Sequence, residues 1–213
     1  MNAQLHLMIV GATGAVGRQV LAAALADSRI DEVVAPTRRP LPAHAKLLNP
    51  VVDFTRLPVD ADWWKVDAVI CALGTTIKAA GSQAAFAAVD RDLPILVAKL
   101  AREAGATRYA LNSSVGASLT GNFYLATKAQ AEAGIRDCGY RVFTIVRPSL
   151  IDAKREQSRP GEAAGILVAR LLRPLIPSRY RAVKAEAIAR ALLDGVLVAQ
   201  PGEHVIESER LHG

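Results

Sequence analysis

The sequence lacks the features of several common protein classes. It has only 2 cysteines among 213 residues, Cys71 and Cys138, and neither has metal-ligand spacing, so a disulfide-rich secreted fold and a cysteine metal site are disfavoured. We expect a reducing, cytoplasmic compartment and no metal. Charged residues interrupt every apolar run before about 18 residues, too short to span a bilayer. The opening MNAQLHLMIVGATG has no basic region before its apolar run, so a signal peptide is not expected.

Runs of basic residues are also missing, although the net charge is +6. Lys and Arg are scattered apart from Arg38-Arg39 and a looser group at Lys154, Arg155 and Arg159, and none alternates with aromatic residues. This distribution argues against a nucleic-acid partner and is compatible with an anionic cofactor. Hydrophobic residues make up 51% and charged residues 22%, which is typical of a globular chain with one core.

What the sequence does have is an alternation of short apolar runs with Ala/Leu-rich segments of helical period. We expect strands at 5–10, 32–37, 51–54, 67–73, 108–113, 141–146 and 204–208, and helices near 15–27, 83–104, 123–137, 162–173 and 185–198. Asn122 is a candidate N-cap, Gly105 a candidate C-cap, and Pro94 should bend or restart its helix. The pattern predicts an α/β fold, a doubly wound parallel sheet of the Rossmann kind, in one domain over 1–213.

The first chemical motif is GATGAVG, which contains Gly11, Gly14 and Gly17 between the first strand and the first helix. Glycines permit a tight turn and a close approach of phosphate to the backbone, and the free amides of the helix start attract the anion. The motif thus predicts a dinucleotide cradle formed by the three glycines with Thr13, Ala15 and Val16. A glycine-rich turn without a ligand is the alternative.

The end of the second strand indicates which nucleotide is bound. An NAD-binding chain usually presents an acidic residue there to the ribose hydroxyls, but Asp31 and Glu32 precede the strand. Arg38 and Arg39 stand at its end, and guanidinium groups suit a 2′-phosphate dianion. NADP is therefore favoured, with NAD as the alternative; two solvated loop arginines are the other interpretation of the pair.

Two further strand ends should face the same ligand. Asp53 and Phe54 close the expected third strand, where a carboxylate could accept from the adenine amino group. Leu73, Gly74 and Thr75 close the fourth, where glycine lets the backbone lie against the cofactor. In parallel sheets, ligands bind at the carboxyl ends of the strands.

Tyr124 and Lys128 lie four residues apart in a predicted helix, shortly after Ser113 and Ser114. Residues at this spacing share a helix face, and an ammonium beside a phenol favours the phenolate that acid-base catalysis needs. Tyr180 and Lys184 repeat the spacing, but no serine-bearing strand end lies just before them. We interpret the first pair as catalytic and the second as the start of a helix with a solvated face.

Together these motifs resemble the short-chain dehydrogenase/reductase superfamily, specifically its atypical members of the Tat-interacting-protein type. The resemblance rests on GATGAVG, CALGTT, FAAVDRDLPILVAKLAREAGATRYALNSSVGAS, NFYLATKAQAE, IVRPSL and REQSRPGE, in this order over nearly the whole chain. It implies that Ser114 polarises a substrate carbonyl, that Tyr124 transfers the proton, and that Lys128 tunes Tyr124 and bonds the nicotinamide ribose. It also implies that Pro148 lies against the carboxamide.

The expected activity is therefore hydride transfer between NADP and a small carbonyl or alcohol substrate, without a nucleic-acid or membrane partner. A nucleotide-sensing regulator without turnover is the alternative, and a homodimer is left open. Because the loop from Ser114 to Tyr124 is short, either Ser113 or Ser114 could reach the carbonyl. The substrate region is expected at about 149–182, where the polar stretch 152–162 is either a lid or a solvated loop.

Overall fold

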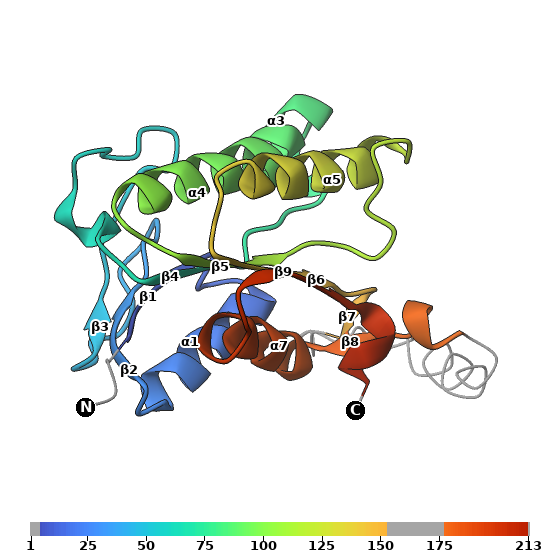
Figure 1. Cartoon of the computed structure of the whole chain (residues 1–213). Coiled ribbons are helices and arrows are strands. Elements are labelled where there is room, and N and C mark those ends of the chain that lie inside the picture. The colour runs from blue at the N-terminus through green and yellow to red at the C-terminus, as the bar shows by residue number, and fades with distance from the viewer. Residues whose placement is uncertain (1–4, 153–176, 213) are drawn as a thin grey trace, which may run out of the picture.

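The computed structural model describes residues 5–152 and 177–212, which form a seven-stranded parallel sheet with helices on both faces (Figure 1). The strand order is β3-β2-β1-β4-β5-β6-β9, and every pairing in it is parallel. The strands are β1 (Leu5–Val10), β2 (Ile30–Val34), β3 (Leu47–Leu48), β4 (Ala68–Cys71), β5 (Arg108–Asn112), β6 (Val142–Arg147) and β9 (Gly202–Glu207).

Two layers of helices cover this sheet, as Figure 1 shows. One face carries α1 (Ala15–Ala26) and α7 (Ala185–Leu197), and the other carries α3 (Gln83–Ala87), α4 (Leu93–Glu103) and α5 (Phe123–Arg136). The remaining short elements are α2 (Ile77–Ala80), β7 (Ile151–Asp152), β8 (Val183–Lys184) and the helical turns η1 (Asp62–Trp64), η4 (Ser178–Tyr180) and η5 (Ser208–Leu211). The doubly wound parallel sheet expected from the sequence is confirmed.

The sheet separates two hydrophobic cores. Strand residues that point to the side of α1 and α7 form the first core, and those that point to α4 and α5 form the second. All four residues of β4 are buried, as expected for a central parallel strand that is covered on both faces. This packing fixes the sheet and therefore the edge at which its strands end.

The third strand is where the sequence prediction was wrong. The structure has β3 at Leu47–Leu48, and the expected strand at 51–54 contributes only an isolated bridge between Val51 and Thr37. The chain turns away at Asp53, whose carboxylate accepts hydrogen bonds from the Thr55 amide and hydroxyl at 2.9 and 2.8 Å. A local turn of this kind competes with strand pairing.

The expected helix over 83–104 is interrupted. Between α3 and α4 lies a π-helical segment, η2 (Ala88–Asp92), and Pro94 occupies the first turn of α4. This position agrees with the expectation that Pro94 restarts the helix, because the first turn needs no amide donor. Gly105 follows the end of α4 with φ +114°, the backbone region expected after a helix C-cap.

The segment expected to form a helix at 162–173 and most of the expected substrate region lie outside the described residues. On either side of them, β7 and β8 pair in parallel as a separate two-stranded sheet. Throughout 5–152 and 177–212, no helix is both long enough and apolar enough to cross a membrane.

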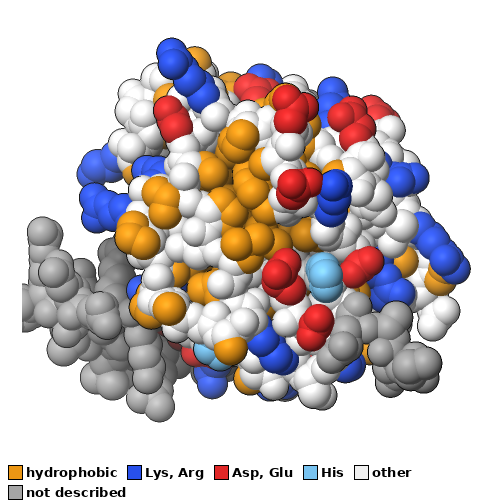
Figure 2. Space-filling model, turned by 90° about the vertical axis from the view of Figure 1, so that its left-hand side faces the viewer, with side chains coloured by type: hydrophobic (Ala, Val, Ile, Leu, Met, Phe, Trp, Pro, Cys, Tyr) orange, Lys and Arg blue, Asp and Glu red, His pale blue; other side chains and the backbone are white. Residues whose placement is uncertain are grey.

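Exposed apolar side chains gather at the β3 side of the molecule. Figure 2 views this side and shows hydrophobic residues in its middle, with charged side chains around them. Leu48, Val51 and Val59 on and after β3 are 43%, 58% and 58% exposed. Contiguous apolar surface is common where proteins associate, and the homodimer left open from the sequence stays a prediction.

Candidate functional site

The glycine turn joins β1 to α1 at the carboxyl edge of the sheet. Gly11 has φ +89°, and a Cβ there would lie 2.7 Å from the Ala72 carbonyl. A Cβ at Gly17 would lie 2.0 Å from the Gly11 oxygen, so neither position accepts a side chain without movement of the backbone. These two glycines are therefore required by close packing of the turn against α1 and β4.

The start of α1 is open to an anion. Gly14 is the N-cap residue, no side chain caps the helix, and no acidic residue lies in its first turn. The first amides of a helix have no partners within it, and together with the helix dipole they attract negative charge. A phosphate placed here would meet free N–H groups and no competing carboxylate from that turn.

A cavity of about 540 Å³ extends from this turn along the strand ends. Eight residues predicted to bind the cofactor line it: Gly11, Thr13, Gly14, Arg38, Phe54, Leu73, Gly74 and Thr75. Its lining also includes residues that were not predicted to bind the cofactor, namely Ala12, Pro36, Thr37, Ala72, Ala79, Ala80, Ala85, Val89 and Leu93. Seven other residues predicted to bind the cofactor are not part of the lining: Ala15, Val16, Gly17, Arg39, Asp53, Lys128 and Pro148. Val16 is buried in the core. The volume and shape suit an elongated, partly apolar ligand.

The two arginines after β2 stand at one end of this cavity. Arg38 lines it, and a neighbouring cavity of about 580 Å³ is lined by Thr13, Arg38 and Arg39. Both arginines are exposed, and neither guanidinium has an ion-pair partner within the described residues. Two such cations beside a phosphate cradle form a suitable environment for a further phosphate group.

Asp53 does not line the cavity, in contrast to the neighbouring Phe54. Its side chain is exposed, and the bonds from the Thr55 amide and hydroxyl lower the pKa of its carboxyl group. In this structure Asp53 therefore stabilises the turn after Val52, while its predicted contact with adenine stays a prediction.

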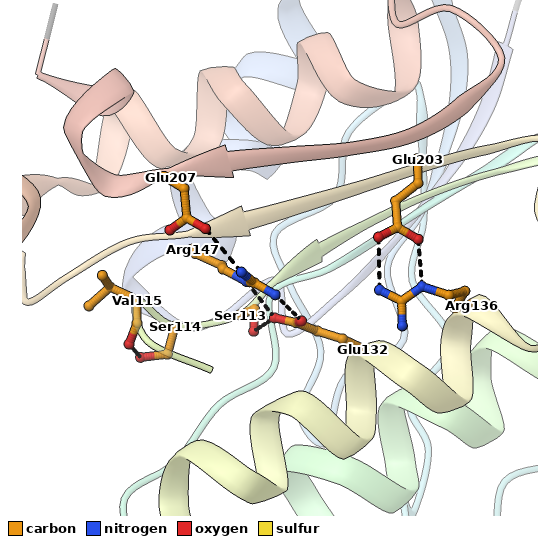
Figure 3. Close-up of polar contacts among 8 residues, drawn as sticks. All are labelled: Ser113, Ser114, Val115, Glu132, Arg136, Arg147, Glu203 and Glu207. Atoms are coloured by element: carbon orange, nitrogen blue, oxygen red, sulfur yellow. Dashed lines mark hydrogen bonds and ion pairs between the residues drawn. The ribbon is translucent and has the colours of Figure 1, made fainter. Parts of the chain in front are cut away.

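The two serines after β5 have different environments. Ser113 is buried, and its hydroxyl donates to Glu132 Oε1 at 2.5 Å (Figure 3). Ser114 is only half-buried, and its hydroxyl has one long contact of 3.5 Å with the carbonyl of Val115. The Ser113 hydroxyl is therefore bonded to Glu132 of α5. The Ser114 hydroxyl is the one that is free to bond a further group.

The loop with these serines is held beside the loop after β6. The Ser113 amide donates to the Val146 carbonyl at 2.8 Å, and the Val115 amide donates to the Pro148 carbonyl at 2.9 Å. Pro148 is buried at this point. Strand-like pairing thus continues beyond β5 and β6 and brings the predicted residues Ser114 and Pro148 into adjacent segments.

Tyr124 and Lys128 lie on successive turns of α5. Asn122 caps this helix by accepting from the Leu125 amide at 3.0 Å, as the sequence predicted. Tyr124 is half-buried, with its ring 5.4 Å from the ring of Phe86 on α3. Lys128 is buried and its side chain is 8% exposed. The helix therefore places the phenol nearer to solvent and the ammonium deeper in the protein.

Lys128 has a carboxylate partner that the sequence analysis missed. Its Nζ lies 2.7 Å from Asp90 Oδ1, and the Asp90 side chain is fully buried. Asp90 Oδ2 accepts from the Thr75 amide at 2.9 Å, and Thr75 lines the cavity. A buried ammonium needs such a partner because desolvation disfavours an isolated charge.

A second polar network supports the serine loop. Arg147 at the end of β6 binds Glu132 of α5 at 3.0 and 2.6 Å and Glu207 of β9 at 2.9 Å (Figure 3). These bonds, led by the one to Glu132, raise the pKa of Arg147, so its charge is permanent. Because Glu132 also accepts from Ser113, one carboxylate connects α5 with the ends of β5 and β6.

The pair at Tyr180 and Lys184 has a different setting. Tyr180 ends the short turn η4 and is 53% exposed, whereas Lys184 lies in β8 and is the N-cap residue of α7. The two residues do not share a helix, so their spacing does not put them on one face. The Tyr180 ring contacts the Arg179 guanidinium at 5.1 Å.

Neither Asp90 nor the Glu132–Arg147–Glu207 network had a local signal in the sequence. Asp90 is one of two acidic residues in VDRD, and its partner comes from α5. A search for charged residues inside otherwise apolar helix faces could have found Asp90 and Glu132, because such residues are rarely buried without a partner. No cluster of three or more metal-ligating residues occurs in the described part of the chain.

Comparison with known proteins agrees with this geometry. Residues 11–166 match the family described as NAD(P)H-binding. The chain is 32% identical to "Protein fmp52, mitochondrial" of Emericella nidulans over 97% of this chain and 93% of that one. It is 31% identical to "Protein HTATIP2" of Rattus norvegicus, over 92% and 83% of the two chains.

Solved structures of similar fold bind NAD. The Bordetella bronchiseptica enzyme WbmG in complex with NAD has a TM-score of 0.67 and 18% identity, with 97% of this chain and 74% of that one covered. MoeE5 in complex with UDP-glucuronic acid and NAD has a TM-score of 0.71 and 19% identity, with coverages of 95% and 76%. At these identities the likeness establishes the fold alone.

The family match, the relatives over most of the chain and the glycine turn at the start of α1 agree. They support a nucleotide-binding role. The chain belongs to the NAD(P)H-binding family, as an atypical short-chain dehydrogenase/reductase-like protein related to fmp52 and HTATIP2.

Proposed function

We propose that the protein is an NADP-dependent oxidoreductase that moves hydride between the nicotinamide and a small carbonyl or alcohol substrate. The observation that carries this proposal is the cavity that connects the glycine turn and Arg38 with the loop at Thr75. Through Asp90, that loop is bonded to Lys128. We therefore place a phosphate cradle and a cationic end in this cavity. Tyr124 and Lys128 are not among its lining residues, and Lys128 is connected to it through Asp90 and Thr75.

The residues present fit NADP. The uncapped start of α1 and the space at Gly11 and Gly14 would receive the pyrophosphate. Arg38 and Arg39, which have no carboxylate partners in the described chain, would bind the 2′-phosphate. The acidic residue that would select NAD is not at this end of β2, since Asp31 lies at the start of the strand.

The bound cofactor supplies the hydride, and the chain supplies position and proton transfer. In carbonyl reduction, the Ser114 hydroxyl would donate a hydrogen bond to the substrate oxygen and Tyr124 would donate its phenolic proton to the same oxygen. Lys128, one turn further along α5, would bond the nicotinamide ribose and so position the cofactor beside the phenol. In alcohol oxidation, the phenolate would accept the proton back.

Calorimetric titration with NADPH and NADH tests the cofactor assignment. The parent protein should bind NADPH more tightly than NADH. Arg38→Ala should lose about tenfold in NADPH affinity and little in NADH affinity, because it removes a charge-assisted hydrogen bond to the 2′-phosphate. Equal affinities of the parent for the two nucleotides would contradict the proposal that the arginines bind the 2′-phosphate.

A panel of aldehydes and ketones with NADPH tests turnover. The proposal predicts consumption of NADPH with at least one member, and its loss in Tyr124→Phe at nearly unchanged NADPH affinity. Binding of NADPH without turnover across the panel would instead support a nucleotide-sensing regulator, the alternative considered from the sequence.

A further inference from the structure

The sheet has an extended edge at β3. β3 is the terminal strand of the sheet on this side, and only Leu47 and Leu48 form it. The chain nevertheless stays extended beyond them, because the Thr37 amide donates to the Pro50 carbonyl at 3.0 Å and the Val52 amide donates to the Thr37 carbonyl at 2.9 Å. The edge therefore runs from Leu47 to Val52, against β2 and the residues that follow it.

A proline in this edge leaves its outer side open. Neighbouring residues of an extended strand direct their backbone groups to opposite sides, and the bonds of Thr37 place Pro50 on the side of β2. There the Asn49 side-chain amide donates to the Ala35 carbonyl at 2.5 Å, which replaces the N–H group that proline lacks. The backbone amides of Asn49 and Val51 point outwards, and neither has a hydrogen-bond partner within 5–152 and 177–212. Open backbone groups of this kind pair with a further strand.

Apolar side chains accompany the open edge. Leu48, Val51 and Val59 are all exposed, and we call these three residues the β3 patch. Figure 2 shows hydrophobic side chains across the middle of this side of the molecule, with charged side chains around them. Four residues after Val59, Trp63 is half-buried, and its ring centroid lies 4.3 Å from that of the buried Trp64. Aromatic residues are enriched at protein interfaces, and association would remove this apolar surface from water.

The amino end of the edge is acidic. Asp31 and Glu32 stand at the start of β2, and the carboxylate of Asp67, before β4, accepts from the His6 amide at 2.8 Å. Lys46 precedes β3, but its ammonium donates to two backbone carbonyls at 2.9 Å each and neutralises no carboxylate. Glu32 forms no ion pair within the described residues.

The carboxyl end of the edge is basic. Arg38, Arg39 and Arg56 are exposed there, and none of them forms an ion pair within the part of the chain that the structure describes. Arg56 lies in the turn after the extended edge, where its amide donates to the Asp53 carbonyl at 3.0 Å. The Asp53 carboxylate belongs to the same turn and is bound by Thr55. The charge therefore changes from negative at the amino end of the edge to positive at its carboxyl end.

We propose that a second copy of this chain docks on the β3 patch, edge to edge, around a two-fold axis that makes the two extended edges antiparallel. The open amides of Asn49 and Val51 then meet backbone carbonyls of the other copy, and the apolar side chains are removed from water. The same arrangement brings the basic end of each copy to the acidic end of the other. A parallel arrangement would bring like charges together, so the charge pattern selects the two-fold dimer.

Arg56 is the arginine that we assign to the contact between the copies, because Arg38 and Arg39 are assigned to the cofactor. The β3 patch lies outside the lining of the cofactor cavity. The dimer therefore does not depend on the proposed hydride transfer, and either proposal can fail without the other.

Sedimentation velocity of the full chain from about 1 to about 100 µM tests the association. The parent should form a species of twice the mass of one chain. Val51→Glu should weaken this association about a hundredfold, because the two-fold axis places an unpaired carboxylate in the interface twice. Val205→Glu is the matched control and should associate like the parent, since Val205 is an exposed valine of β9 at the opposite edge of the sheet.

Two arginine variants test the charge pattern. Arg56→Glu should weaken association about tenfold at a salt concentration of about 0.05 M, and about 0.5 M salt should weaken the parent more than this variant, because salt screens charges at an interface rim. Arg141→Glu reverses an exposed arginine just before β6 and should associate like the parent. Circular dichroism reports whether each variant is folded, and Val59→Glu takes the place of Val51→Glu if the latter does not fold.

Dissociation of the dimer by Val51→Glu and Arg56→Glu, but not by the two control variants, would support the proposal. A parent that stays monomeric at about 100 µM would overturn it, as would a dimer that survives Val51→Glu. Loss of the dimer in Val205→Glu would place the interface at β9 instead. Assembly beyond two copies would contradict a closed two-fold interface, and equal effects of Arg56→Glu and Arg141→Glu would contradict the antiparallel charge contact.

Discussion

Two tyrosine-lysine pairs with the same spacing end in opposite environments. Tyr124 and Lys128 share the helix α5, and Lys128 is buried against Asp90. Tyr180 and Lys184 fall in η4 and β8, and both are exposed. The comparison shows that a four-residue spacing puts two side chains on one face only when one helix spans it. It also shows that the buried lysine has a carboxylate partner, whereas the exposed lysine needs none.

Replacement of the two phenols should give the largest difference between the two tyrosine-lysine pairs, and this difference is in the rate of carbonyl reduction. Tyr124→Phe should lower carbonyl reduction about a thousandfold, within the range for loss of a general acid, whereas Tyr180→Phe should stay within about twofold of the parent. Initial rates with a carbonyl substrate from the panel measure both, and the affinity for NADPH should be unchanged. Activity that survives in Tyr124→Phe would remove this phenol from the mechanism.

The two lysines should differ nearly as much in stability. Lys128→Met leaves the buried Asp90 carboxylate without its ion-pair partner and should lower the free energy of unfolding by about 3 kcal/mol. Lys184→Met, at an exposed position, should change it by less than about 0.5 kcal/mol. Urea unfolding followed by circular dichroism gives both values. Similar stabilities of the two variants would contradict the burial of the Lys128–Asp90 pair.

Replacement of Ser113 and Ser114 sharpens the contrast, because only the first tyrosine-lysine pair follows a strand that ends in serines. Ser114→Ala should lower the turnover rate about a hundredfold, as expected for loss of a donor to the reacting oxygen, with little change in stability. Ser113→Ala should instead lower the free energy of unfolding by about 1 kcal/mol, because Glu132 loses a buried hydrogen bond. The reverse pattern would assign the catalytic role to Ser113.

Replacement of the N-cap residues of α5 and α7 should give the smallest difference, and this difference is in stability. Asn122→Ala removes the side-chain cap of α5 and should cost about 1 kcal/mol of stability. Lys184→Ala should cost much less, since α7 begins without a side-chain cap. Thermal unfolding of the two variants makes the comparison, and a larger loss in Lys184→Ala would contradict it.

The sequence was sufficient for the architecture and for the elements that carry the site. The strand-helix alternation, the start of α5 with its Asn122 cap and the glycine turn all follow from local patterns, and local patterns decide them in the structure. The strand expected at 51–54 failed because the Asp53 turn, a side-chain interaction with Thr55, ends the extended segment.

The parts of the site that could not be predicted depend on contacts between distant residues. Asp90 and Lys128 are 38 positions apart in the sequence, and their proximity depends on the π-helical turn and on how α5 packs against it. The choice between Ser113 and Ser114 likewise depends on Glu132, which comes from α5. Composition and spacing carry no information on such pairings before the sheet is assembled.

The most direct measurement of the central claim, that the buried lysine of α5 borders the nucleotide cavity, is calorimetric titration of NADPH into Lys128→Met and Lys184→Met. We predict about a tenfold weaker affinity for Lys128→Met and parent-like affinity for Lys184→Met. Equal affinities of the two variants would contradict the claim, because the lysine of α5 would then contribute nothing to binding of the cofactor.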